Sequence, residues 1–140
     1  MDELTIVGKP VISGSANGTA LVSSEPLSFW GGYDWKSGEI IDHKHSLSGL
    51  NAKGKILAIP FTRGSSTTTA VLLEAIRAET APHAIITTET DFFFALASVV
   101  ATELYSQSLT LVAISEGDFA RLQTGDEIEI DNDGLITVHR

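Results

Sequence analysis

Three short apolar runs, separated by segments with helical periodicity, constrain the fold of this chain more than any other feature. The runs cover residues 55–60, 84–87 and 109–114, and each has the length of a strand that is covered on both faces. Between the first two, residues 67–79 place apolar side chains on one side and charged side chains on the other, which predicts an amphipathic helix. This alternation of strand and helix predicts a sheet that is at least partly parallel.

A second helix is expected over residues 92–104, with Asp91 as its N-cap. Nearly all of its positions are apolar, so we expect this helix to be packed deeply around its whole circumference. Residues 115–122 have the pattern of a short helix or turn.

The two ends of the chain carry further strand signals, separated by glycine and proline residues. These runs cover residues 4–7, 11–13, 19–23, 127–130 and 135–138. The last two would form a hairpin closed by Asn132, Asp133 and Gly134, which is a strong turn sequence. Since no linker interrupts the pattern, the sequence predicts one α/β domain over residues 1–140, with three layers in the order β/β/α.

Charge and composition argue against several classes of partner. The chain has 140 residues, with 9 Lys and Arg against 18 Asp and Glu, and a formal charge of -9. An acidic surface repels phosphate backbones and anionic membranes, so neither nucleic acid nor a membrane is expected as a partner. The acidic N-terminus does not resemble a signal peptide, and a cytoplasmic location is expected. Because the chain has no cysteine, it is not expected to hold an iron–sulfur or zinc-thiolate site by itself.

The loop between the first buried strand and the helix that follows it is the leading candidate for chemistry. Ligands of open α/β sheets gather at the carboxyl ends of strands, where a helix N-terminus offers unpaired N–H groups. Gly64 would let the backbone approach a ligand closely, and Arg63 would add a planar cation suited to a carboxylate or phosphate. Ser65 and Ser66 would add hydroxyl groups. Serine at a helix start is more often a simple cap, and spacing alone leaves both interpretations open.

A polar and aromatic loop over residues 29–49 is long for a compact domain, which favours a functional role. Its large aromatic side chains could line a binding surface or cover a small core, and they are Trp30, Tyr33 and Trp35.

Two histidines of this loop, His43 and His45, lie two residues apart. Lys44 between them disfavours a cation, so we interpret them as solvated loop histidines, and no metal site is predicted on this chain. His83 directly precedes a predicted strand, and we interpret it as structural.

Six segments of the chain together resemble a known family. They cover residues 28–34, 42–49, 53–60, 63–66, 72–73 and 80–82. These segments resemble the small subunit of aconitase X, and the similarity extends over residues 11–138. The Arg-Gly-Ser-Ser motif alone is moderately specific, whereas its combination with a Phe-x-Gly-Gly-x-Asp loop and an Ala-Pro turn is much more so.

The resemblance implies a swivelling β/β/α domain, equivalent to the mobile fourth domain of aconitase. It implies a subunit of a hydro-lyase that is active only together with a larger subunit. That larger subunit is expected to hold an iron or iron–sulfur centre, and no cofactor is expected on this chain.

The resemblance also assigns roles to residues. The serine base of the family corresponds to Ser65. Three neighbours would bind the substrate, namely Arg63, Gly64 and Ser66. Four loop residues would belong to the site or to the subunit interface, namely Gly31, Gly32, Asp34 and His45.

Two activities are known for the family, and both consume a small hydroxy acid. One is dehydration of cis-3-hydroxy-L-proline to pyrroline-2-carboxylate, and the other is dehydration of mevalonate 5-phosphate. The aromatic loop at residues 30–35 favours the first. The chain departs from the family at Thr62, where glycine is common, and at Ser46, where proline is common. Thr62 could narrow the loop and alter the substrate.

Interpretations from other classes stay open. Residues 8–10 and 14–20 also resemble the start of phosphohistidine swivel domains, which carry phosphate on an exposed histidine ahead of a helix. Here Ser65 and Ser66 occupy that position, whereas His83 lies before a strand. The chain could also be an adaptor that only binds a partner.

Overall fold

The structure is a computed structural model and describes residues 3–62 and 66–140. Its strands are β1 (Glu3–Val7), β2 (Lys9–Ile12), β3 (Ala16–Val22), β4 (Ile56–Ala58), β5 (Ala84–Thr87), β6 (Thr110–Ala113), β7 (Glu127–Ile130) and β8 (Leu135–His139). Its helices are α1 (Ser66–Arg77), α2 (Phe92–Tyr105) and α3 (Glu116–Phe119). None of these helices, which come from the described ranges alone, is long and apolar enough to cross a membrane.

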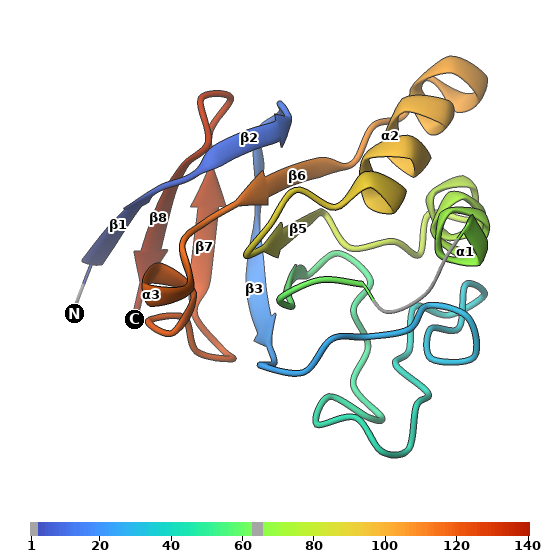
Figure 1. The fold of residues 1–140 in the computed structure, drawn as a ribbon, viewed down its shortest axis with the longest axis horizontal. Coiled ribbons are helices and arrows are strands. Elements are labelled where there is room, and N and C mark those ends of the chain that lie inside the picture. Colours follow the sequence, from blue (N-terminus) through green and yellow to red (C-terminus); the bar gives the residue numbers. More distant parts are fainter. Residues whose placement is uncertain (1–2, 63–65) are drawn as a thin grey trace.

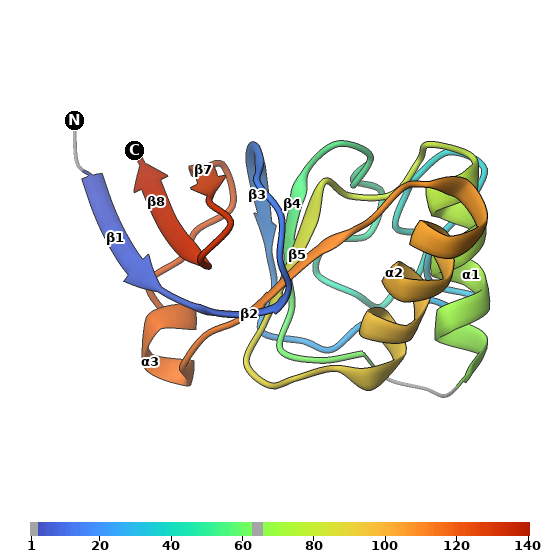
Figure 2. The same cartoon turned by 90° about the horizontal axis from the view of Figure 1, so that it is seen from above.

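The strands are hydrogen-bonded in the order β1-β8-β7-β3-β4-β5-β6-β2. The pairs β3–β4, β4–β5 and β5–β6 are parallel, and each pair that involves β1, β2, β7 or β8 is antiparallel. Figure 2 shows the three layers that result: β1, β7 and β8 on one side, the sheet around β3, β4 and β5 in the middle, and α1 with α2 on the other side. The predicted β/β/α order and the partly parallel sheet are confirmed.

Gly8 is the point at which the N-terminal strand passes from one strand layer to the other. Its N–H donates to the carbonyl of Gly134 at 3.0 Å, in the turn between β7 and β8. A Cβ atom at Gly8 would lie 2.3 Å from Cγ1 of Val112, so a larger residue would not fit there. Gly134 has a φ of 84°, which glycine adopts without strain, and the predicted hairpin turn is confirmed.

Two apolar cores separate the layers, and neighbouring residues of the central strands face different cores because side chains alternate along a strand. Ile56 and Ile86 lie in the core between the two strand layers, together with Ile136. Leu57 and Ile85 lie in the core on the helix side. The central strands are therefore buried on both faces, as their short apolar runs predict.

Helix α2 is less buried than its sequence predicts. One side carries the buried residues Phe94, Ala97 and Ala101, whereas Phe92 and Val99 on the other side are 67% and 51% exposed. The expectation that the whole circumference is packed is wrong, because α1 and the sheet cover α2 from one side only. Figure 1 shows α2 at the outer margin of the fold.

The connection between β3 and β4, residues 23–55, is anchored to the helix-side core by aromatic side chains. The rings of Phe29 and Tyr33 stack with centroids 4.8 Å apart, and Phe29 meets Phe94 of α2 edge-on at 5.2 Å. The Tyr33 hydroxyl donates to the carbonyl of Thr80 at 2.7 Å. Burial raises the pKa of this hydroxyl above its ordinary value. Tyr33 therefore covers a core. Of the two roles that the sequence left open for the loop aromatics, binding surface or core, it has the second.

Candidate active site

The carboxyl ends of the parallel strands meet at one edge of the central sheet. The chain leaves β4 through Thr62, and it leaves β5 through Asp91. Helices α1 and α2 both begin at this edge, and Figure 2 shows them side by side. This is the edge at which open α/β sheets place their ligands.

Asp91 joins the two connections at this edge. Its Oδ1 atom accepts hydrogen bonds from the N–H groups of Phe93 and Phe94, at 3.0 and 3.1 Å, and so caps α2 as predicted. Its Oδ2 atom accepts from the N–H of Thr62 at 2.9 Å. One carboxylate therefore fixes both the start of α2 and the residue at the end of the β4 connection.

The Thr62 side chain links that same residue to two further elements. Its hydroxyl donates to the carbonyl of Leu27 at 3.2 Å and lies 3.2 Å from the hydroxyl of Thr68 in α1. Because Thr62 uses its proton on Leu27, Thr68 is the donor in the second pair. Both threonines are buried, so the Thr62 hydroxyl points into the protein and away from solvent.

Thr69 adds a third link at the start of α1, since its hydroxyl donates to the carbonyl of Phe93 at 3.0 Å. The hydroxyl groups of Thr68 and Thr69 thus bind neighbouring elements instead of a ligand. Residues 65–69 are five consecutive serines and threonines, called the hydroxyl run below, and for Thr68 and Thr69 the structural interpretation holds.

The predicted site residues Arg63, Gly64 and Ser65 lie outside the described residues. Ser66 is the first residue of α1. Thr62 precedes this segment and α1 follows it. The two are joined by the hydrogen bond between the hydroxyl groups of Thr62 and Thr68.

Three of the predicted loop residues, Gly31, Gly32 and Asp34, shape turns of the connection between β3 and β4, and their role at a site or interface stays a prediction. Gly31 has a φ of 77°, and a Cβ atom at Gly32 would lie 2.1 Å from the carbonyl oxygen of Ser28. Asp34 accepts the N–H of Lys36 through Oδ1 at 2.9 Å. Its neighbour Tyr33 binds the carbonyl of Thr80, which follows the C-terminal end of α1.

His45 is buried inside the loop and is not solvated as the sequence predicts. The N–H of Leu47 donates to its Nδ1 atom at 3.1 Å, so Nε2 carries the proton and donates to the carbonyl of Glu25 at 3.2 Å. Both ring nitrogens are therefore used within the loop. His43 is exposed, as predicted. Within residues 3–62 and 66–140, no three His, Cys, Asp or Glu side chains gather closely enough to hold a metal ion.

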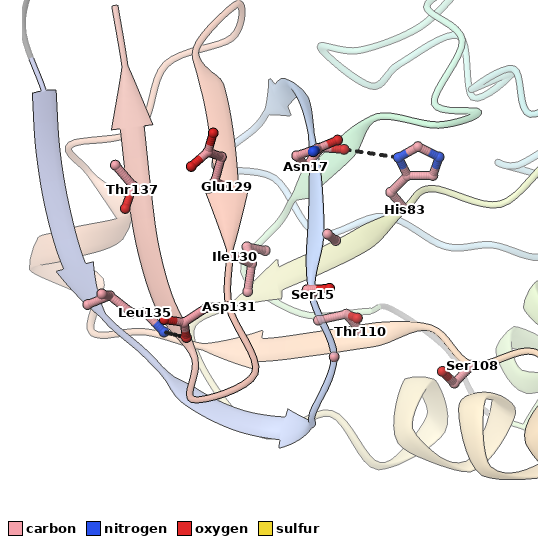
Figure 3. Close-up of a pocket in the computed structure, with 12 residues that line it drawn as sticks. Ser15, Asn17, His83, Ser108, Thr110, Glu129, Ile130, Asp131, Leu135 and Thr137 are labelled. Carbon is pink, nitrogen blue, oxygen red and sulfur yellow. Dashed lines mark hydrogen bonds between the residues drawn. The ribbon is translucent and has the colours of Figure 1, made fainter.

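A groove lies at the opposite edge of the sheet, at the amino ends of the parallel strands. Figure 3 shows this groove of about 770 Å³, with Glu129 and Asp131 on one wall and His83 on another. The Nδ1 atom of His83 donates to the carbonyl of Asn17 at 3.0 Å, which agrees with a structural role. Because its charged carboxylates are not balanced by Lys or Arg in the described lining, the groove is poorly suited to an anionic ligand.

Comparison with known proteins points to one family. The profile of the aconitase X swivel domain matches residues 5–138. A cis-3-hydroxy-L-proline dehydratase of Pseudomonas aeruginosa is 46% identical over 79% of this chain and 19% of that protein. A phosphomevalonate dehydratase small subunit of Methanosarcina mazei is 34% identical over 86% of this chain and 81% of that subunit.

A solved structure is similar over almost the whole chain. The crystal structure of Thermococcus kodakaraensis aconitase X in its holo-form superposes with a TM-score of 0.86 at 29% identity, and the match covers 98% of this chain and 99% of that chain. The lengths of the relatives differ. The present chain spans about a fifth of the cis-3-hydroxy-L-proline dehydratases, with 19% and 22% of their lengths matched, and most of the small subunits.

Proposed function

The chain belongs to the aconitase X swivel-domain family, and we propose that it supplies a serine base, Ser65, to a dehydratase whose other active-site groups lie on a larger polypeptide. The observation that supports this most is that the residues on both sides of 63–65 are held in place by hydrogen bonds. Thr62 is held by Asp91 and Leu27 on one side, and α1 is held by Thr68 and Thr69 on the other, all at the ligand-binding edge of the sheet.

In this proposal Ser65 first loses its hydroxyl proton to solvent, and the resulting alkoxide takes the proton from the substrate carbon and becomes the hydroxyl again. The substrate hydroxyl leaves on the side of the larger polypeptide. A serine hydroxyl is a weak acid, and burial alone would make its alkoxide less favourable. The positive end of α1 and nearby backbone N–H groups would stabilise that anion. Arg63 would bind a carboxylate or phosphate of the substrate through its planar guanidinium.

The chain's own residues do not fit a metal centre of the kind the family implies. The sequence has no cysteine, and the described residues offer no cluster of metal ligands. We therefore assign the expected iron or iron–sulfur centre to the larger polypeptide and give this chain the roles of base and substrate-binding surface.

The proposed substrate is cis-3-hydroxy-L-proline, which would be dehydrated to pyrroline-2-carboxylate. The support is the 46% identity to a dehydratase named for that substrate, against 34% for the small subunit from Methanosarcina mazei. Mevalonate 5-phosphate is the second candidate, because several small subunits named for it match over most of their length, for example over 94% in Thermococcus sibiricus.

The test is Ser65→Ala, assayed for dehydration of both substrates with the larger polypeptide present. We expect turnover to fall by at least about 10³-fold, within the range that removal of a catalytic group gives, while the two proteins still assemble. Ser108→Ala is the matched control, because Ser108 is an exposed serine that lines the groove at the opposite edge. Near-normal turnover in Ser65→Ala would end the proposal, and loss of turnover in Ser108→Ala would move the active site to the other edge.

A further inference from the structure

Over residues 92–99, one side of α2 is apolar, exposed and free of charge, and the exposed Glu103 continues the same side one turn beyond Val99. Phe92, Leu96 and Val99 are spaced four and three residues apart, so they share one face of the helix, and all three are exposed. Residues 92–102 contain no charged side chain, in a chain with a formal charge of -9. A contiguous exposed apolar surface of this kind is typical of a protein interface. These three residues are called the α2 outer face below.

The α2 outer face begins at the candidate active site. Phe92 directly follows Asp91, whose carboxylate binds the N–H of Thr62. Phe61, on the other side of that hydrogen bond, is also exposed. The α2 outer face therefore begins next to the edge of the sheet at which residues 63–65 connect β4 to α1.

Two observations indicate what covers this face. The chain spans about a fifth of the cis-3-hydroxy-L-proline dehydratases, so in those relatives a much larger part of the protein accompanies this domain. A second copy of the chain is a poorer candidate, because two molecules with a formal charge of -9 repel each other.

We infer that the α2 outer face, together with Phe61, is the surface on which the larger dehydratase polypeptide docks. This rests on the proposed function, in which that polypeptide must bring its substrate to the edge that carries Ser65. The face borders this edge, and covering its three apolar side chains removes apolar surface from water, while Glu103 lies one turn beyond them at the rim. Docking along α2 would also exclude water from the mouth of the site.

The test compares two substitutions of the same kind. Val99→Glu places a charge on the α2 outer face, and Val7→Glu places one at a 79% exposed position of β1 in the outer strand layer. Leu96→Glu is a second variant of the face. The probe is the protein of the same organism that matches the remaining four fifths of the Pseudomonas aeruginosa dehydratase, and the Kd for each variant is measured by calorimetry. We expect Val99→Glu and Leu96→Glu to raise the Kd by at least about tenfold, while Val7→Glu leaves it unchanged.

Circular dichroism melts of the isolated variants show whether each one is folded before binding is measured. Wild-type Kd values for both Val99→Glu and Leu96→Glu would overturn the inference, and so would wild-type chain that does not bind the probe. If the wild-type chain sediments as a dimer and Val99→Glu abolishes that dimer, the face binds a second copy of the chain. This result would also overturn the inference. A different result would contradict the proposed function and leave the docking surface intact. In that result the wild-type chain binds the probe and Val99→Glu weakens the binding, but the wild-type pair dehydrates neither substrate.

Discussion

At the scale of single residues, Asp91 stands out because its two carboxylate oxygens serve different elements. One oxygen caps α2, and the other holds the N–H of Thr62, directly before the segment that carries the proposed base. Thr62 in turn reaches Leu27 and Thr68 through its hydroxyl. The threonine that replaces the family's common glycine is therefore a structural link between three elements, with its hydroxyl turned inward.

Asp91→Ala removes the helix cap and the contact to Thr62 together. We expect the free energy of unfolding to fall by about 1–3 kcal/mol, since a cap and a hydrogen bond to a charged group are lost. We also expect turnover of the assembled enzyme to fall by about 10–100-fold below the melting temperature, because the connection to the base is no longer held in place.

Ser115→Ala is the control for this prediction. The Ser115 hydroxyl caps α3 by accepting the N–H of Asp118 at 3.1 Å, and α3 lies across the central sheet from α1 and α2 (Figure 2). Its loss should lower the stability measured by urea denaturation by about 0.5–2 kcal/mol without changing turnover. If Asp91→Ala lowers stability and leaves turnover intact, Asp91 is only a cap and not a positioning residue.

At the scale of elements, the long connection between β3 and β4 depends on Tyr33. Its hydroxyl is buried, donates to the Thr80 carbonyl and has a raised pKa because of burial. A tyrosine whose pKa is higher in the folded state than in the unfolded state stabilises the fold fully below its unfolded pKa. That contribution is lost as the pH rises above this value.

We therefore expect the free energy of unfolding to decrease from about pH 10 upward, by about 1.4 kcal/mol per pH unit for this group. Tyr33→Phe should lack this part of the pH dependence and should cost about 1 kcal/mol at neutral pH, because the Thr80 carbonyl loses its donor. Urea denaturation of both proteins at several alkaline pH values is the measurement. Identical pH profiles for the two proteins would contradict the assignment.

The elements that the sequence predicts well are those whose signal is local. Strands β5 and β7, the Asp91 cap and the turn at Gly134 all follow from short patterns of apolar, capping and turn residues. The exposure of α2 is not predicted, because a helix that is apolar on all sides does not reveal which side its neighbours cover.

The contacts that define the candidate site are missed for a different reason. The bond from Thr62 to Asp91 joins residues 29 positions apart, and the bond from Tyr33 to Thr80 joins residues 47 positions apart. The buried His45 forms a hydrogen bond to the carbonyl of Glu25, 20 positions away. Such pairs arise only when the elements pack, so no local pattern encodes them. The placement of the candidate site at the end of β4 follows from strand order alone, and it stays a prediction.

At the scale of the whole molecule, the two edges of the central sheet differ in chemistry. The carboxyl edge carries the hydroxyl run, the neighbouring Arg63 and an uncharged apolar face on α2. The amino edge carries the groove with Glu129 and Asp131. Under the proposed function, a domain of this family that swivels toward a larger polypeptide would present the first edge, since that edge carries the proposed base and borders the α2 outer face.

The most direct test of Ser65 as the base is a crystal structure of the assembled enzyme with substrate bound. We expect Ser65 Oγ to lie within about 3–3.5 Å of the carbon that loses its proton, the distance of a reactive arrangement. A structure in which that hydroxyl is turned into the protein, capping α1 and remote from the substrate, would contradict it.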